Sequence, residues 1–114
     1  MQADEARILD ILLAADEIAE YVAGKSFDDY LKSSVTRAGV QWQVYTIGEA
    51  ARQISALFRE RHTTVPWHKI IGARNVLAHE YGRVDHEIMW KIATVYVPEL
   101  AAYLTPLGPH EVEE

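Results

Sequence analysis

Side chains with complementary chemistry lie close together near position 75 of this sequence. The octapeptide RNVLAHEY, residues 74–81, contains Arg74, Asn75, His79 and Tyr81 within about two helical turns. An arginine is always charged and binds phosphate oxygens through its forked guanidinium group. A histidine titrates near neutral pH, so it can both accept and donate a proton. A phosphate clamp beside a proton shuttle is what the cleavage of RNA without a metal ion requires.

The spacing of these residues does not place Arg74 and His79 on one face of a regular helix. Each residue turns the helix by about 100°, so residues five positions apart point about 140° away from each other. Asn75 and His79 share a face, and Arg74 nearly coincides with Tyr81. One chain therefore presents a split site, unless the helix bends or the long Arg74 side chain wraps around it. Two copies facing each other across a two-fold axis would bring two arginines and two histidines into one cleft.

The spacing alone is also compatible with purely structural roles for these residues. An arginine and a histidine near a helix end usually form a surface ion pair or interact with the helix dipole. A tyrosine at such a place usually packs with its hydroxyl exposed, and Glu80 is either paired with a basic residue or solvated. The sequence HEYGR departs from the H-E-x-x-H zinc pattern. We therefore predict no metal site and no cofactor, although other histidines are present: His62, His68, His86 and His110.

Length and composition indicate one soluble globular domain. The chain has 114 residues, of which 49% are hydrophobic and 25% are charged, and it has no cysteine. We predict a single domain over residues 1–108, followed by an acidic tail over residues 109–114. No apolar run reaches the roughly 18 residues that a membrane span needs. The first residues, MQADE, are acidic, whereas a secretory signal begins basic and then turns apolar. We therefore expect a cytoplasmic protein that does not enter a membrane.

The formal net charge of −6 argues against a free-standing nucleic-acid binder, because contacts with phosphates dominate that kind of affinity. Much of the acidic excess is local, in the tail and in the first predicted helix. The central part of the sequence is richer in basic residues, namely Arg37, Arg52, Arg59, Arg61, Lys69, Arg74 and Arg83. Charge alone therefore leaves open a basic groove on an acidic body.

Hydrophobic residues at helical spacing predict helices throughout the first half of the chain. The first helix runs from about Ala3 to Ala23 and ends at Gly24. Ser26 opens a short variant of the capping box, and the helix that it starts continues through Val35. A longer helix covers about residues 40–61 and ends at a stretch that contains Pro66.

The second half continues the helical pattern. Trp67 follows Pro66 at the start of a short helix that extends to about Tyr81 and ends at Gly82. Asp85 caps the last helix, which Pro98 kinks or restarts. We predict an all-α fold, an antiparallel bundle of four to five helices. Residues expected to face its interior include Leu9, Leu57, Ile88, Val95 and Tyr96.

The motif and its surroundings resemble a known family. The segment GARNVLAHEYGRVD, residues 72–85, resembles the R-x4-H-x-Y signature of HepT-like toxins of the HEPN superfamily (higher eukaryotes and prokaryotes nucleotide-binding domains). Four longer segments follow the family pattern in order, so that the resemblance extends from Arg7 to Leu100: RILDILLAADEIAEYVAGKSFDDYL, IGEAARQIS, VPWHKIIGARNVLAHEY and VDHEIMWKIATVYVPEL. A bare R-x4-H occurs by chance in many chains, but within this ordered frame it is specific.

The resemblance implies a HEPN-like bundle and a metal-independent endoribonuclease whose site forms across a homodimer, or across a higher homo-oligomer of dimers. His79 would act as general base on the ribose 2′-hydroxyl or as general acid on the leaving 5′-oxygen. Arg74 would bind the scissile phosphate, and Asn75 would orient the imidazole or the substrate. RNA is the implied substrate, with products that end in a 2′,3′-cyclic phosphate.

The resemblance further implies control by a partner. Tyr81 matches the tyrosine that accepts AMP from a minimal nucleotidyltransferase (MNT) antitoxin in type VII toxin–antitoxin pairs of the HepT/MntA kind. AMP beside Arg74 would block the phosphate clamp by charge and by volume. Glu49 matches a recurring acidic position of the family, and it either supports Arg74 or lies on the surface.

The sequence is also compatible with a second function. HEPN-like bundles also serve as non-catalytic binding modules for nucleotidyltransferases, and the acidic charge suits such a role. Cleavage of RNA by the purified protein separates the two functions. We expect the tryptophans to be core or interface anchors rather than platforms for base stacking: Trp42, Trp67 and Trp90.

Overall fold

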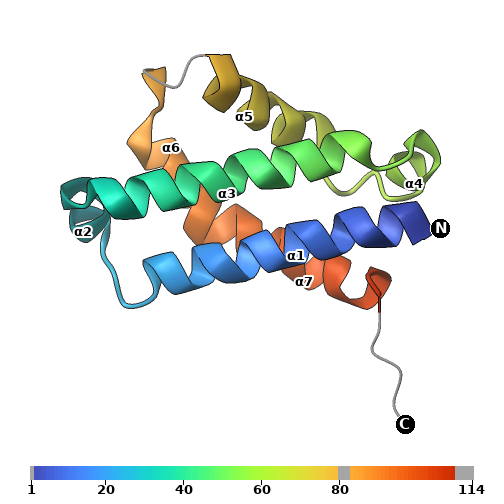
Figure 1. The fold of residues 1–114 in the computed structure, drawn as a ribbon, viewed down its shortest axis with the longest axis horizontal. Helices are drawn as coiled ribbons and strands as arrows, with labels where there is room; N and C mark the ends of the chain where they lie inside the picture. Colours follow the sequence, from blue (N-terminus) through green and yellow to red (C-terminus); the bar gives the residue numbers. More distant parts are fainter. Residues whose placement is uncertain (1, 80–82, 110–114) are drawn as a thin grey trace, which may run out of the picture.

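The fold is a bundle of helices, described here by a computed structural model for residues 2–79 and 83–109 (Figure 1). Helices α1 (Gln2–Val22) and α3 (Ser34–Gln53) lie antiparallel along each other, and α5 (Trp67–His79) packs on α3. The all-α antiparallel bundle predicted from the sequence is confirmed. The remaining elements are α2 (Phe27–Lys32), α4 (Ala56–Arg61), α6 (His86–Lys91), the π-helix η2 (Ile92–Tyr96), α7 (Val97–Leu104) and the 3-10 helix η3 (Thr105–Leu107).

Local capping signals are found where the sequence indicates them. Gly24 follows α1 with a φ of 70°, which suits a glycine at a helix end. Ser26 and Asp29 form both hydrogen bonds of a capping box at the start of α2. The predicted continuation of this helix to Val35 is wrong, because Ser33 ends α2 and caps α3. Its hydroxyl oxygen accepts a hydrogen bond from the Thr36 amide at 3.1 Å.

The single long helix predicted over residues 40–61 is divided into α3 and α4. Ile54 adopts an extended conformation, and Ser55 caps α4 by accepting a hydrogen bond from the Phe58 amide at 3.1 Å. Asp4 of α1 accepts hydrogen bonds from the Ser55 amide at 2.8 Å and from the Ser55 hydroxyl at 2.7 Å. The break is therefore fixed by a residue of another helix, which periodicity within residues 40–61 does not reveal.

The last helical stretch bends where Pro98 enters it. Asp85 caps α6 as predicted, accepting hydrogen bonds from the amides of Glu87 and Ile88. The π-helix η2 then leads into α7, which has Pro98 in its first turn. A proline lacks the amide hydrogen and its ring clashes with the carbonyl of the preceding turn, so a local widening of the helix accommodates it. The predicted kink or restart at Pro98 is confirmed.

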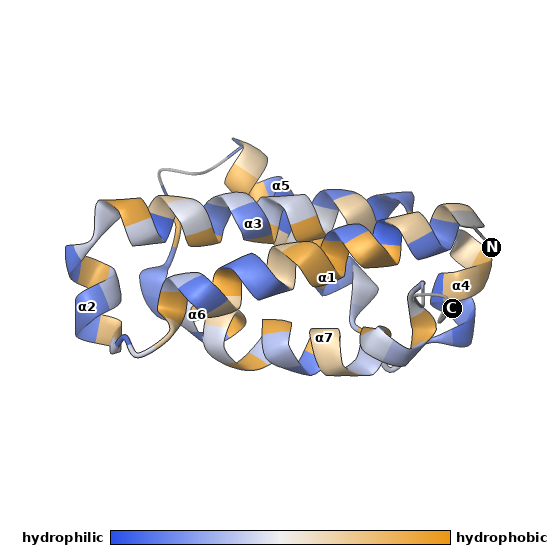
Figure 2. Cartoon of the chain, turned by 60° about the horizontal axis from the view of Figure 1, so that its bottom comes forward, coloured by the Kyte–Doolittle hydropathy of each residue, from blue (hydrophilic) through white to orange (hydrophobic). Residues whose placement is uncertain are grey.

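The core lies between α1, α3 and the α6–α7 stretch, where each helix turns its apolar side inward (Figure 2). Trp67 is buried, whereas Trp42 is 63% exposed and is not part of the core. Periodicity indicates that a helix has an apolar side, but neighbouring helices need not cover all of it. Five residues predicted to face inward are exposed: Leu9, Leu57, Ile88, Val95 and Tyr96.

Candidate active site

Helix α5 carries the Arg–His motif, and a buried side chain anchors it near each end. Near its start, the buried Trp67 donates a hydrogen bond from Nε1 to the carbonyl of His62 at 3.0 Å. Near its other end, Leu77 is buried in the core. The helix is a regular α-helix through His79, so the predicted angular separation of Arg74 from His79 is retained. Arg74 faces α3 and His79 is exposed.

Arg74 is held over α3 by three neighbours. Its side chain is only 18% exposed, and its Nε lies 2.7 Å from Glu49 Oε1 in a close ion pair. The guanidinium carbon lies 5.3 Å from the centre of the Tyr45 ring, at the distance of a cation–π contact. Nη1 donates a hydrogen bond to Asn75 Oδ1 at 2.9 Å. These contacts restrict the long side chain to one direction before any ligand arrives.

Glu49 links two arginines. In addition to Arg74, it accepts hydrogen bonds from Arg52 Nε at 3.1 Å and from Arg52 Nη2 at 3.4 Å. The pKa of Glu49 is lowered, first by the hydrogen bond from Arg52, against an opposing effect of burial, and then by the charges of Arg52 and Arg74. Of the two roles left open for Glu49 by the sequence, the structure shows the one in which it supports Arg74.

Gly48 allows α3 and α5 to approach closely at this point. A Cβ atom at position 48 would lie 2.2 Å from the Arg74 Cβ and 3.1 Å from the Ile70 carbonyl oxygen. Only glycine fits this crossing without separating the helices. Gly48 was not predicted to belong to the site. The feature that could have indicated it is a glycine in the interior of a predicted helix, directly before the acidic residue that contacts Arg74.

Asn75 contacts Arg74 through its side chain. From its position on the same helical face as His79, the sequence suggested that it orients the imidazole or the substrate. In the structure its side-chain oxygen accepts the hydrogen bond from Arg74, the residue before it. Tyr81, the predicted AMP acceptor, lies outside the described residues, as do Glu80 and Gly82, the predicted end of this helix.

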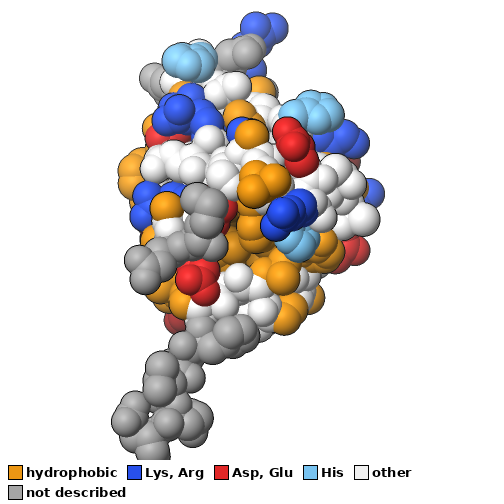
Figure 3. Space-filling view, turned by 90° about the vertical axis from the view of Figure 1, so that its right-hand side faces the viewer, with side chains coloured by type: hydrophobic (Ala, Val, Ile, Leu, Met, Phe, Trp, Pro, Cys, Tyr) orange, Lys and Arg blue, Asp and Glu red, His pale blue; other side chains and the backbone are white. Residues whose placement is uncertain are grey.

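Basic residues in the middle of the sequence have different partners in the described part of the chain. Arg52 and Arg74 meet at Glu49, whereas Arg37 donates hydrogen bonds to backbone carbonyls of Tyr30 and Leu31. Figure 3 shows the end of the molecule near the N-terminus, where charged side chains of both signs are interspersed with apolar ones. Arg74 is therefore accompanied by a second guanidinium, that of Arg52, on the carboxylate of Glu49.

Over residues 2–79 and 83–109, no group of three or more metal-binding side chains is clustered. The histidines in this part of the chain lie apart, with His62 Nδ1 2.9 Å from the Tyr103 hydroxyl and the His86 ring against Tyr30. Among the described helices, none is both long and apolar enough to cross a membrane.

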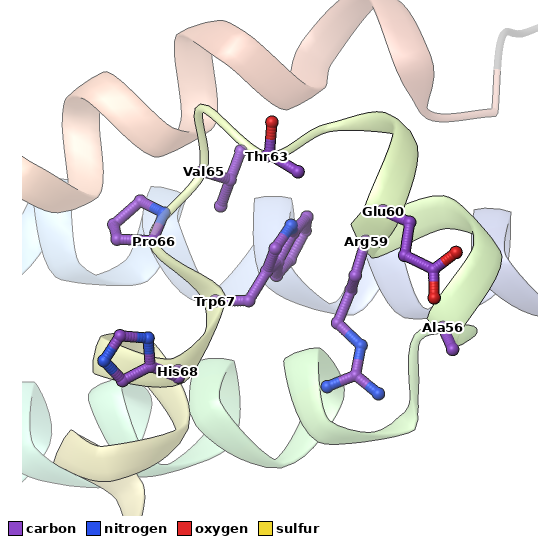
Figure 4. Close-up of a pocket in the computed structure, with 8 residues that line it drawn as sticks. All are labelled: Ala56, Arg59, Glu60, Thr63, Val65, Pro66, Trp67 and His68. Atoms are coloured by element: carbon purple, nitrogen blue, oxygen red, sulfur yellow. The ribbon is translucent and has the colours of Figure 1, made fainter.

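Two hollows flank α5 away from Arg74. A groove of about 650 Å³ runs between α5 and the η2–α7 stretch, and aliphatic side chains such as Val76 and Ile88 line it. A shallower hollow of about 570 Å³ lies at the loop between α4 and α5, where Arg59 lies beside Trp67 (Figure 4). Neither contains Arg74 or His79 in its lining; Arg74 lies where α5 packs on α3, and His79 is exposed at the end of α5.

The fold and this surface define a class: an all-α bundle that presents an arginine, fixed by an acidic residue of a neighbouring helix, on the same helix as an exposed histidine. The family model of the HepT-like ribonucleases matches residues 11–107. The chain belongs to the HepT-like family.

Several curated proteins are similar over most of their length. A candidate RNase of Methanocaldococcus jannaschii is 33% identical over 84% of this chain and 88% of its own. A candidate RNase of Caldanaerobacter subterraneus is 42% identical over 79% of this chain and 80% of its own. A protein of Thermococcus cleftensis, described as a probable ribonuclease HepT, is 32% identical over 80% of this chain and 83% of its own. No solved structure matches the chain.

Proposed function

We propose that this protein is the toxin of a HepT/MntA-like toxin–antitoxin pair and that it cleaves RNA without a metal ion. The observation that carries the proposal is the fixed guanidinium of Arg74 on the helix that also presents His79. Membership of the HepT-like family and the RNase descriptions of several relatives support the same activity. A ribonuclease of this kind needs a fixed positive group for the phosphate and a titrating group for proton transfer.

The reaction is an internal displacement at phosphorus. A general base removes the proton of the ribose 2′-hydroxyl, and the resulting oxygen attacks the adjacent phosphorus. The bond from phosphorus to the 5′-oxygen breaks, and a general acid gives a proton to that leaving oxygen. The products are a 2′,3′-cyclic phosphate and a free 5′-hydroxyl. His79 serves as base or acid, and Arg74 stabilises the charge on the non-bridging phosphate oxygens.

The active unit in this proposal is a two-fold homodimer. Within one chain, Arg74 points toward α3 while His79 is exposed further along the regular helix. A second copy supplies the missing histidine to each arginine, so that one histidine acts as base and the other as acid. Two exposed aliphatic side chains, Val76 of α5 and Ile88 of α6, support a protein contact along this part of the surface.

Control is proposed to act through Tyr81. A nucleotidyltransferase partner transfers AMP to the phenol oxygen, with release of pyrophosphate from ATP. The added phosphate is anionic and competes for the Arg74 guanidinium, while the adenosine fills space that the RNA needs. The motif match at Tyr81 supports this assignment, since the residue itself lies outside the described part of the chain.

The decisive experiment compares RNA cleavage by the purified wild-type protein with that by His79→Ala and Arg74→Ala, in the presence of a metal chelator. We expect cleavage by the wild type, products with cyclic phosphate ends, and losses of at least about a hundredfold in both variants with unchanged helical content. Wild-type cleavage that disappears with the chelator would refute metal independence. Full activity of both variants would remove these residues from the catalysis.

The competing function is that of a non-catalytic module that binds a nucleotidyltransferase. It predicts a different result for the same experiment. It requires a wild-type protein that binds the transferase and leaves RNA intact. The fixed guanidinium has no role in that function, and for this reason we favour the ribonuclease.

A further inference from the structure

An aromatic stack continues the surface on which Arg74 lies. The Trp42 ring lies 5.6 Å from the Tyr45 ring with an angle of 24° between their planes, so the two rings are stacked. The Arg74 guanidinium in turn lies over the Tyr45 ring. Trp42 and Tyr45 come from successive turns of α3, and α5 lies along that helix (Figure 1). A single ring therefore separates Trp42 from the candidate phosphate clamp.

Trp42 is the most exposed aromatic side chain in the described part of the chain, at 63%. A tryptophan left in water forgoes the free energy that burying its ring would release, which is why such residues frequently mark contact surfaces. The orientation of the ring is nevertheless set by the half-buried Tyr45 beneath it. An exposed ring with a fixed plane offers a flat binding surface at little cost in conformational entropy.

The order of groups on this surface matches one class of ligand. Two guanidinium groups around the single carboxylate of Glu49 leave a net positive charge, and an aromatic plane lies next to it. A single-stranded nucleic acid has the same alternation, with an anionic phosphate one sugar away from a flat base. The opposite flank of α5 is different, because its groove is lined mainly by aliphatic side chains.

We infer that Trp42 is a stacking platform for an unpaired base of the RNA next to the phosphate held by Arg74. This inference rests on the proposed function for the identity of the ligand, and it names single-stranded RNA as the substrate class. The exposure of Trp42 contradicts the core position predicted for it, and the inference takes the place of the interface anchor that was its alternative. Because stacking on an aromatic ring does not depend on hydrogen bonds, the platform accepts any of the four bases.

Binding of a single-stranded RNA oligonucleotide with 2′-O-methyl riboses tests the platform, since this ligand lacks the attacking hydroxyl and stays intact. Trp42→Ala should bind it at least about fivefold more weakly than the wild type, and Trp42→Phe should recover most of the loss. Tyr96→Ala is the matched control. Tyr96 is also exposed and has the Lys91 ammonium 5.7 Å from its ring, but it lies on η2. We expect its affinity to equal that of the wild type.

An oligonucleotide with abasic positions separates stacking from charge. The wild type should bind it at least about fivefold more weakly than the complete oligonucleotide, whereas Trp42→Ala should bind both equally. A Trp42→Ala variant that binds like the wild type, or that becomes monomeric while the wild type is dimeric, would overturn the platform. The second result would assign the ring to a contact with another copy.

Cleavage of the unmodified oligonucleotide separates this inference from the proposed function. If the wild type cleaves and Trp42→Ala binds normally, only the platform fails. If the wild type binds through Trp42 but does not cleave, only the proposed catalysis fails. A wild type that neither binds nor cleaves RNA would refute both.

Discussion

Arg74 owes its direction to Glu49, and the charge of that carboxylate is the first feature to test. Glu49 is a positioning residue, because it contacts the guanidinium and not the reacting atoms. Glu49→Gln keeps the shape but removes the charge, so we expect kcat/KM for RNA to fall by about tenfold to a hundredfold. Arg52→Gln is the control. It removes the other partner of Glu49, leaves the Arg74 ion pair, and should cost less.

A double variant distinguishes positioning from a general structural effect. If Glu49 acts through Arg74, adding Glu49→Gln to Arg74→Ala should cause no further loss of activity. Independent, additive losses would show that Glu49 contributes by another route.

The proposed role of Tyr81 can also be measured directly. Tyr81→Phe removes the phenol oxygen to which AMP would be joined. Co-expressed with the nucleotidyltransferase, the wild-type chain should gain the mass of AMP, whereas Tyr81→Phe should keep its own mass and remain toxic. The physical reason is that the guanidinium then stays available to RNA phosphate. AMP found on another residue, with the variant still neutralised, would exclude Tyr81 from the control mechanism.

At the scale of the elements, the crossing of α3 and α5 depends on Gly48. Gly48→Ala places a methyl group against the Arg74 Cβ, so the helices must separate or shift. We expect the free energy of unfolding to fall by about 2 kcal/mol, and RNA cleavage to fall as well, because Arg74 moves away from Glu49. Urea unfolding and the cleavage rate measure the two effects.

Gly72 of α5 provides the matched control for this crossing. A Cβ atom there meets nothing within 4 Å. Gly72→Ala should therefore stabilise the protein by up to about 1 kcal/mol through helix propensity and leave the cleavage rate unchanged. Equal effects of the two substitutions would contradict a special role for the close approach at Gly48.

The junction of α1 with α4 gives a pH-dependent prediction. Asp4 is 4% exposed; burial raises its pKa, but the hydrogen bonds from Ser55 outweigh that effect and the net pKa is lowered. The ionised carboxylate therefore stabilises the fold above the usual pKa of 3.8, and this contribution is lost as the pH falls through the lower folded value. Asp4→Asn should decrease the free energy of unfolding by about 2 kcal/mol at pH 7.

The way in which this loss of stability changes with pH shows whether the charge of Asp4 is responsible. The difference in unfolding free energy between wild type and Asp4→Asn should shrink below the usual pKa, because both side chains are then neutral. Asp10→Asn is the control, since Asp10 forms a partly exposed ion pair with Arg7 and should change the stability by no more than about 0.5 kcal/mol. A pH-independent difference for Asp4→Asn would show that its charge is not responsible.

At the scale of the whole molecule, the separation of Arg74 from His79 predicts sharing of the site between two chains. Neither Arg74→Ala nor His79→Ala should cleave RNA alone. A mixture in which heterodimers form should recover part of the activity, because the shared cleft then contains an intact arginine from one chain and an intact histidine from the other. Mass measurement of the heterodimer and the cleavage rate of the mixture test this. Heterodimers without any recovered activity would favour a site within one chain.

Much of the local architecture could be predicted from the sequence. The capping residues Ser26 and Asp85, the break at Pro98 and the helical stripes depend on neighbours within a few positions, and those interactions are the same in any tertiary context. The motif also indicated which side chains carry chemistry, and its spacing indicated that Arg74 and His79 diverge. The ordered family pattern added the expected class of fold and activity.

Tertiary structure decided how these elements meet. The break at Ser55 depends on Asp4, and the direction of Arg74 depends on Gly48 and Glu49, all of which belong to other helices. The exposure of Trp42 followed from which stripe of α3 the neighbouring helices cover. Periodicity within a helix reports that an apolar side exists, but contacts between residues distant in sequence determine how much of it is buried and which polar groups become partners.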